Sequence, residues 1–188
     1  MKILFIDTTT TDLTVAVVTD NQIYDATAPD VSVRHSVLLC EKVDEALKLA
    51  NITFNDLDAY ACAIGPGSFT GIRIGVSTVK GYCTAVERPL IAVNCLNAIA
   101  TSVKCGAKGS AIIDAGNGWY FADCINNVAP ILIPYEDSRA DGAGRATSSA
   151  DYFDGAVDIV RNKFSSGTFD ADLKPLYIRR SQAEENRK

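Results

Sequence analysis

The sequence predicts an α/β protein with two duplicated lobes, the second of them truncated. Two observations support this prediction. Strand-like apolar runs alternate with helical stretches over the first lobe, which indicates a mixed sheet covered by crossover helices. After the "KCGAKG" stretch the same opening pattern begins again, which is typical of an internal repeat. We therefore expect an N-terminal lobe over residues 1–103 and a reduced C-terminal lobe over 104–188.

Composition limits the classes of protein that this chain can represent. Of its 188 residues, 47% are hydrophobic and 22% are charged, as in ordinary globular proteins. No apolar run approaches the roughly 18 to 20 residues of a membrane span, so we expect no membrane partner. The net charge of -5 argues against nucleic-acid binding by the chain on its own. The six cysteines are well separated and lie mostly in apolar stretches, which favours buried thiols and a cytoplasmic location.

The first lobe opens with "KILFID", an apolar strand that ends at Asp7. Two strands of a hairpin follow, and then apolar residues fall on one face of an amphipathic helix. A buried strand, a glycine-rich turn and further elements complete the lobe, with Asn94 as the cap of its last helix. The expected elements are strands 2–7, 13–18 and 22–27, helix 32–50, strand 58–64, helix 71–86, strand 89–94 and helix 95–103.

The second lobe repeats the layout of the first three strands. "SAIIDAGNGWYFADCINNVAPILIP" reads as strand, aspartate, turn, strand, turn and strand, and Asp114 takes the place of Asp7. The polar stretch at 135–149 predicts a surface loop, which a helix over 150–164 and the "LKPLYIRRS" segment follow. Too few residues remain for a second full set of crossover units, so this lobe is the shorter one.

The stretch "AIGPGSFTGIRIG" at 63–75 is rich in glycine but matches no known phosphate cradle. A P-loop needs a lysine that this stretch lacks, and a dinucleotide fingerprint would follow the first strand. Phe69 occupies the centre of the only possible nucleophile elbow. In the helix that follows, small residues form one stripe, which favours close approach of another helix from the same lobe or from a partner. This stripe consists of Gly71, Ile74, Gly75, Thr78, Gly81 and Ala85.

Few residues are candidates for chemistry. Asp7, Thr8 and Thr9 would hold a phosphate or a metal ion, or would simply form the hairpin turn. Asp114, followed by "AGNG", leaves the same alternatives open. His35 is the only histidine, so a two-histidine metal site and an HExxH protease motif are excluded. We expect no metal site and no catalytic residue, and we expect His35 to act as a capping or interface residue.

Several segments of the chain together resemble the TsaB (YeaZ) family. They are "FIDTTTTDLTVAVV", "RHSVLLCEKVDEAL", "AIGPGSFTGIRIGVSTVKGYCTAVERPLIAVNCLNAIA", "IIDAGNGWYF" and "LKPLYIRRSQAEE". The resemblance implies the actin-like ATPase (ASKHA, ribonuclease H-like) fold. It also implies a role in making N6-threonylcarbamoyladenosine (t6A) in tRNA.

The family resemblance implies a non-catalytic subunit that binds and activates the paralogue TsaD. TsaE would join as the ATPase, and tRNA would be bound only through the complex. A further hypothesis, which rests on the small and apolar helix faces and not on the resemblance, is that the isolated chain forms a homodimer through the same two helices of the first lobe. The implied partner-binding residues are His35, Ser36, Leu39, Val43, Phe69, Arg73, Ile74, Gly75, Ser77, Thr78, Lys80 and Gly81.

A second hypothesis keeps nucleotide chemistry in this chain. A degenerate nucleotide hydrolase or phosphotransferase of the same fold would use Asp7 and Asp114, with Thr8 and Thr9 at the nucleotide. The subunit hypothesis requires no cofactor of this chain, although ATP or ADP with Mg²⁺ would fit at an interface with a partner. Mg²⁺-dependent ATP turnover would distinguish the two hypotheses.

Overall fold

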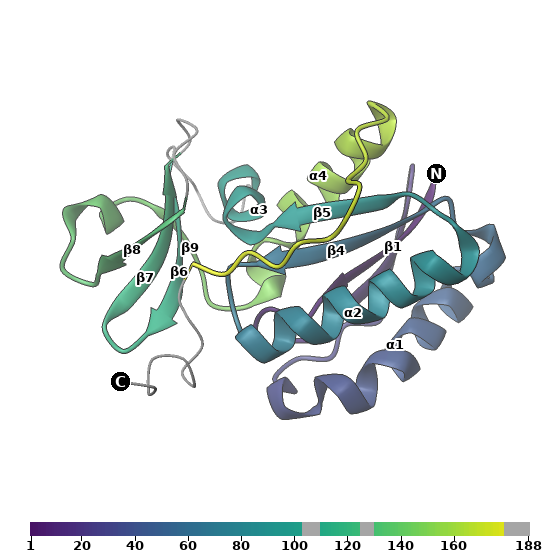
Figure 1. Cartoon of the computed structure of the whole chain (residues 1–188), viewed down its shortest axis with the longest axis horizontal. Helices are drawn as coiled ribbons and strands as arrows, with labels where there is room; N and C mark the ends of the chain where they lie inside the picture. Colours follow the sequence, from purple (N-terminus) through teal and green to yellow (C-terminus); the bar gives the residue numbers. More distant parts are fainter. Residues whose placement is uncertain (103–109, 125–129, 179–188) are drawn as a thin grey trace.

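The computed structural model describes residues 1–102, 110–124 and 130–178, which form two mixed sheets (Figure 1). The first sheet has the strand order β3-β2-β1-β4-β5, and the second has the order β8-β7-β6-β9. The strands are β1 Lys2–Asp7, β2 Thr14–Thr19, β3 Ile23–Asp25, β4 Ala59–Gly65, β5 Leu90–Asn94, β6 Ser110–Gly116, β7 Trp119–Cys124, β8 Ile131–Pro134 and β9 Gly144–Ala146. The α-helices are α1 His35–Leu49, α2 Phe69–Val86, α3 Cys95–Thr101 and α4 Phe153–Ser165.

Strand β1 is the centre of the first sheet. It pairs antiparallel with β2 and parallel with β4. Its side chains alternate between two cores: Leu4 and Ile6 pack under α1 and α2, and Ile3 and Phe5 face α3 and α4. All four side chains are almost completely buried. A strand that is covered on both faces reads as a continuous apolar run, which is why "KILFID" was recognisable as a strand.

The helices lie on opposite faces of the first sheet, with α1 and α2 side by side on one of them (Figure 1). Helix α4 follows the second sheet in sequence, yet it packs on α3 and β5 of the first. One hydrophobic cluster therefore joins Ile91 and Leu96 to Phe121 of the second sheet and Val160 of α4. The two lobes share this core. The predicted boundary at 103/104 lies outside the described residues.

The second sheet repeats the first, as the sequence predicted. Strands β6, β7 and β8 form an antiparallel meander like that of β1, β2 and β3, and β9 lies parallel to β6 as β4 lies parallel to β1. Among the described residues the second sheet has no counterpart of β5, so this lobe is the smaller one. The prediction of a loop over 135–149 was wrong at β9, because this three-residue strand contains Gly144 and Ala146 and offers no apolar run.

The glycines at the start of α2 fit the turn that follows β1. A Cβ atom at Gly67 would overlap the carbonyl oxygen of Thr9, and one at Gly71 would overlap that of Thr8. The Thr8 hydroxyl donates to the Gly71 carbonyl at 2.7 Å. The small stripe was expected to receive another helix, but at Gly71 and Gly75 the element that approaches is this turn.

Two other observations concern the helices. Ser68 caps α2, because its hydroxyl accepts the Gly71 N–H at 3.1 Å. None of the helices in the described part of the chain combines the length and the apolar character needed to cross a membrane.

Two glycine substitutions in α2 should have opposite effects on stability. Gly71→Ala should lower the free energy of unfolding by about 2 kcal/mol or more, because its methyl group would collide with the backbone at Thr8. Gly81→Ala should raise it by about 0.5 to 1 kcal/mol, because the site is exposed, has open space and lies inside a helix. Urea unfolding of both variants measures these changes. Equal effects at the two sites would contradict the packing described here.

Candidate functional site

A groove of about 550 Å³ lies between the N-terminal halves of α1 and α2. Leu39, which is 2% exposed, forms part of its floor. Hydroxyl groups from both helices line its sides, and Arg73 contributes the charge. The lining residues are Ser36, Leu39, Cys40, Phe69, Thr70, Arg73, Ile74, Ser77 and Thr78. Most of the residues that the sequence assigned to partner binding are thus brought together in one place.

Apolar side chains are also exposed at the beginning of α1. Val33, just before the helix, is 91% exposed, and Val37 is 69% exposed. Val33 lies in the short 3-10 helix Ser32–Arg34, which leads directly into α1. Exposed apolar groups beside a groove are characteristic of protein-binding surfaces. Neither valine was among the residues selected from the sequence.

Other residues assigned to partner binding lie away from the groove surface. His35 and Val43 are buried under α1, and Gly75 is buried against Thr8. Within the described residues, neither ring nitrogen of His35 has a hydrogen-bond partner. Gly81 is exposed near the other end of α2. Contact of these residues with a partner stays a prediction.

A segment after α4, Asp172–Tyr177, runs back along the first sheet to the start of α2; we call it the C-terminal strap (Figure 1). The Tyr177 ring stacks on Phe69 with 4.6 Å between centroids, and its hydroxyl accepts the Arg73 Nε–H at 3.0 Å. Further along α2, the Lys80 ammonium forms an ion pair with Asp172 at 2.5 Å. Lys80 therefore faces the strap rather than the groove. The sequence analysis did not select Tyr177.

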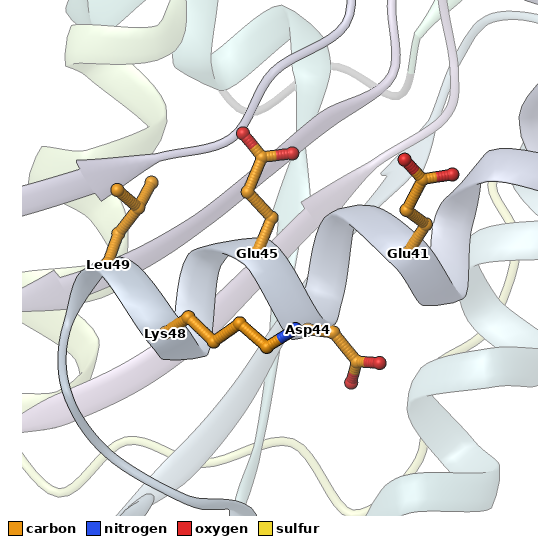
Figure 2. A pocket seen from close by; sticks show the side chains of 5 residues that line it. All are labelled: Glu41, Asp44, Glu45, Lys48 and Leu49. Carbon is orange, nitrogen blue, oxygen red and sulfur yellow. The ribbon is translucent and has the colours of Figure 1, made fainter.

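A second hollow, of about 430 Å³, lies along α1 away from these residues. Figure 2 shows its lining, Glu41, Asp44, Glu45, Lys48 and Leu49, all projecting from this one helix. The Lys42 ammonium neutralises part of the acidic surface by pairing with Glu45 at 2.6 Å. None of the residues assigned to a site from the sequence lies here.

Asp7 is fully buried at the end of β1. Its Oδ1 accepts the Thr9 N–H at 2.7 Å, and its Oδ2 accepts the Tyr152 hydroxyl at 2.7 Å. Burial raises the pKa of Asp7 above its ordinary value, while these hydrogen bonds partly oppose the shift. The same carboxylate and burial raise the pKa of Tyr152, with burial as the larger cause.

The turn after β1 is closed from the side of the second lobe. The Thr14 hydroxyl lies 2.7 Å from that of Ser149, and the Thr10 hydroxyl accepts the Ser149 N–H at 3.1 Å. The groups that would bind a phosphate are therefore engaged within the protein. The nucleotide role of Asp7, Thr8 and Thr9 stays a prediction, which this geometry does not favour.

Asp114 has a different environment, although it ends the equivalent strand. It is exposed, and its Oδ1 accepts the Gly116 N–H and the Tyr135 hydroxyl, both at 2.7 Å. The structure thus does not give Asp7 and Asp114 matching access to a ligand. Across residues 1–102, 110–124 and 130–178, no group of three His, Cys, Asp or Glu side chains could hold a metal ion.

Comparison with known proteins identifies relatives of this chain in sequence and in fold. The model of the family described as TsaD, tRNA N6-adenosine threonylcarbamoyltransferase, matches residues 15–123. The chain belongs to this family. It is 35% identical to the Escherichia coli tRNA threonylcarbamoyladenosine biosynthesis protein TsaB over 121 residues, which are 63% of this chain and 52% of that protein.

Curated TsaD enzymes align with a shorter stretch of this chain than TsaB does. The tRNA N6-adenosine threonylcarbamoyltransferase of Rhizobium johnstonii is 34% identical over 94 residues, or 50% of this chain and 26% of that enzyme. The chain thus spans about a quarter of the length of these curated TsaD relatives.

Solved structures extend the likeness to nearly the whole TsaD-family chain. YeaZ from Pseudomonas aeruginosa superimposes with a TM-score of 0.75 at 20% identity, covering 94% of this chain and all of that one. A second structure, titled as an uncharacterised protein with similarity to peptidase YEAZ from the same organism, gives a TM-score of 0.73 at 21% identity and covers 95% of this chain and 99% of that one. The resemblance to TsaB (YeaZ) and the actin-like fold with two lobes are therefore confirmed.

Asp7→Asn should remove a pH-dependent part of the stability of this TsaB-like chain. The pKa of Asp7 is raised by folding above 3.8, so the folded state holds this proton more tightly than the unfolded chain. The contribution is therefore present below pH 3.8 and is lost as the pH rises through the raised pKa. The free energy of unfolding of the wild type should fall relative to that of Asp7→Asn over this range.

Urea unfolding of both proteins at a series of pH values between about 3.5 and 7.5 measures this difference. Asp114→Asn, which removes an exposed carboxylate at the equivalent strand end, is the control. A wild-type minus Asp7→Asn difference that stays constant over the series would contradict a buried carboxyl group with a raised pKa.

Proposed function

We propose that this TsaB-like chain is a non-catalytic subunit that binds and activates a TsaD-like enzyme in the t6A modification of tRNA. The observation that carries the proposal is the groove between α1 and α2, where the residues expected from the family resemblance converge. Exposed apolar side chains at Val33 and Val37 adjoin the same end of α1. A helix of the partner would bury these groups and fill the groove.

The state of the candidate catalytic groups supports a non-catalytic role. The chain has one histidine, so it cannot supply the histidine pair that the family resemblance assigns to TsaD. That histidine, His35, is 1% exposed and lies inside the core. The Asp7 carboxylate is likewise sealed by Thr9 and Tyr152. The transfer of the threonylcarbamoyl group therefore falls to the TsaD-like subunit in this proposal.

The remaining components follow from charge and from the resemblance. With a net charge of -5, this chain would meet tRNA only through the complex. TsaE would supply ATPase activity. ATP or ADP with Mg²⁺ would bind at an interface between subunits. Without its partner, the same groove and valines would favour a homodimer.

Ile74→Glu should weaken binding to the TsaD-like subunit at least about tenfold, because it places a charge in the groove where the partner buries apolar surface. Isothermal titration calorimetry measures the affinity. Formation of t6A on tRNA, with TsaE and the threonylcarbamoyl adenylate present, should fall in parallel. Leu49→Glu is the matched control, because Leu49 is 51% exposed at the far end of α1.

Equal affinities of Ile74→Glu, Leu49→Glu and wild type would contradict docking through the groove. An absence of association between wild type and the TsaD-like subunit would contradict the proposed function itself. Mg²⁺-dependent ATP turnover by the isolated chain, lost on Asp7→Asn, would instead support the nucleotide hydrolase. Light scattering with and without the partner tests whether homodimer and heterodimer compete for one face.

A further inference from the structure

The C-terminal strap is fixed to the first lobe at several points. Leu173 is completely buried in the core under α1 and α2. The Leu176 N–H donates to the Ile64 carbonyl at 2.8 Å, at the end of β4. At the start of the strap, Asp172 pairs with Lys80. The strap thus holds Tyr177 at a defined place beside the first turn of α2.

Tyr177 fixes the orientation of the Arg73 guanidinium. The guanidinium carbon lies 4.0 Å from the centre of the Phe69 ring and 5.7 Å from that of Tyr177. The Nε–H donates to the Tyr177 hydroxyl at 3.0 Å. Stacking and the Nε hydrogen bond together restrict the plane of the group. An arginine held in this way loses little side-chain entropy when it binds a further ligand.

Within the part of the chain that the structure describes, the terminal nitrogens of the same guanidinium have no hydrogen-bond partner. Arginine has five N–H donors, and in the described residues only the Nε–H of Arg73 forms a hydrogen bond or ion pair. Lys80 offers the contrast on the same helix, because its charge is neutralised by Asp172. The terminal nitrogens of Arg73 remain available to a ligand from outside.

Arg73 and Lys80 are seven residues apart in α2, which is about 700° of helical rotation. Arg73 and Lys80 therefore lie on nearly the same side of α2, two turns apart. The strap crosses this side and neutralises only one of them.

The chemistry of the groove indicates what this ligand is. Among the described residues that line the groove, Arg73 is the one charged side chain, and the others are apolar or carry hydroxyl or thiol groups. A single oriented guanidinium in a neutral surface is complementary to a single carboxylate, which it can bind through two parallel hydrogen bonds. The remaining surface suits apolar and small polar side chains.

We propose that Phe69, Arg73 and Tyr177 form a carboxylate-binding anchor of the docking face, which receives an Asp or Glu side chain from the helix of the TsaD-like subunit that fills the groove. This inference rests on the proposed function and names the partner's chemistry at that site. Arg73 contacts the carboxylate, and Tyr177 is a positioning residue that acts through Arg73.

Arg73→Met should weaken binding of the TsaD-like subunit about 10- to 100-fold, as expected for the loss of hydrogen bonds to a charged group. It should also reduce the dependence of the affinity on salt. Arg88→Met is the matched control, because it makes the same chemical change just beyond the other end of α2, where the Arg88 guanidinium donates to the Asn55 carbonyl at 3.2 Å. The control should bind like wild type.

Tyr177→Phe keeps the aromatic stack but removes the hydroxyl that orients Arg73, so it should weaken binding about 3- to 10-fold. In the Arg73→Met background the same change should have almost no effect, because the group that Tyr177 positions is gone. A merely structural role would instead give the same loss in both backgrounds. Hydrogen exchange at the Leu176 amide checks that the strap stays in place in each variant.

The outcomes separate this inference from the proposed function. If wild type does not bind the TsaD-like subunit, both fail. If wild type binds and Arg73→Met binds as tightly as Arg88→Met, the anchor alone is overturned. If Arg73→Met weakens only self-association, measured by light scattering, the carboxylate belongs to a second copy of this chain and the assignment to a TsaD-like partner is overturned.

Discussion

The rest of the structure depends on the contact between the turn after β1 and the start of α2. Thr8 and Thr9 lie so close to Gly67 and Gly71 that no side chain fits between them. Hydrogen bonds from the Thr8 hydroxyl and the Ser68 N–H tie the two backbones together. This contact sets the depth at which α2 sits on the sheet and, with α1 beside it, the width of the groove.

The same contact also helps to enclose Asp7, which is fully buried. The turn that could have surrounded a phosphate is covered by α2 on one side and by Ser149 and Tyr152 on the other. Asp7 then serves to join the lobes, because its carboxylate links the turn to the residue that precedes α4. The groove between α1 and α2, by contrast, is open at the surface.

Sequence reasoning succeeded where the pattern was local. Helical and strand periodicity predicted most elements and the duplication. The small-residue stripe of α2 included Ile74, and the family resemblance named Ser77; both residues line the groove. It failed for contacts between distant segments. Tyr177 lies 104 residues from Arg73, and Tyr152 lies 145 residues from Asp7, so no local period reports either pair. The sequence showed the stripe of small residues in α2, but it did not show what packs against them. A turn can pack closely against small residues as well as a helix can, and at Gly71 and Gly75 it is the turn after β1 that does so.

The groove and the core are linked through α2. Ile72 and Val76 are buried in the core, while Arg73, Ile74 and Ser77 on the same turns are directed toward the groove. A shift of α2 that relieves a clash at Gly71 must therefore also move the groove, because a helix moves as a rigid unit over such short lengths. The strap adds a second fixed point on this helix, through Lys80 and Arg73. A surface held from beneath by backbone contact and from the side by the strap is organised before any partner arrives, which reduces the entropy lost on binding.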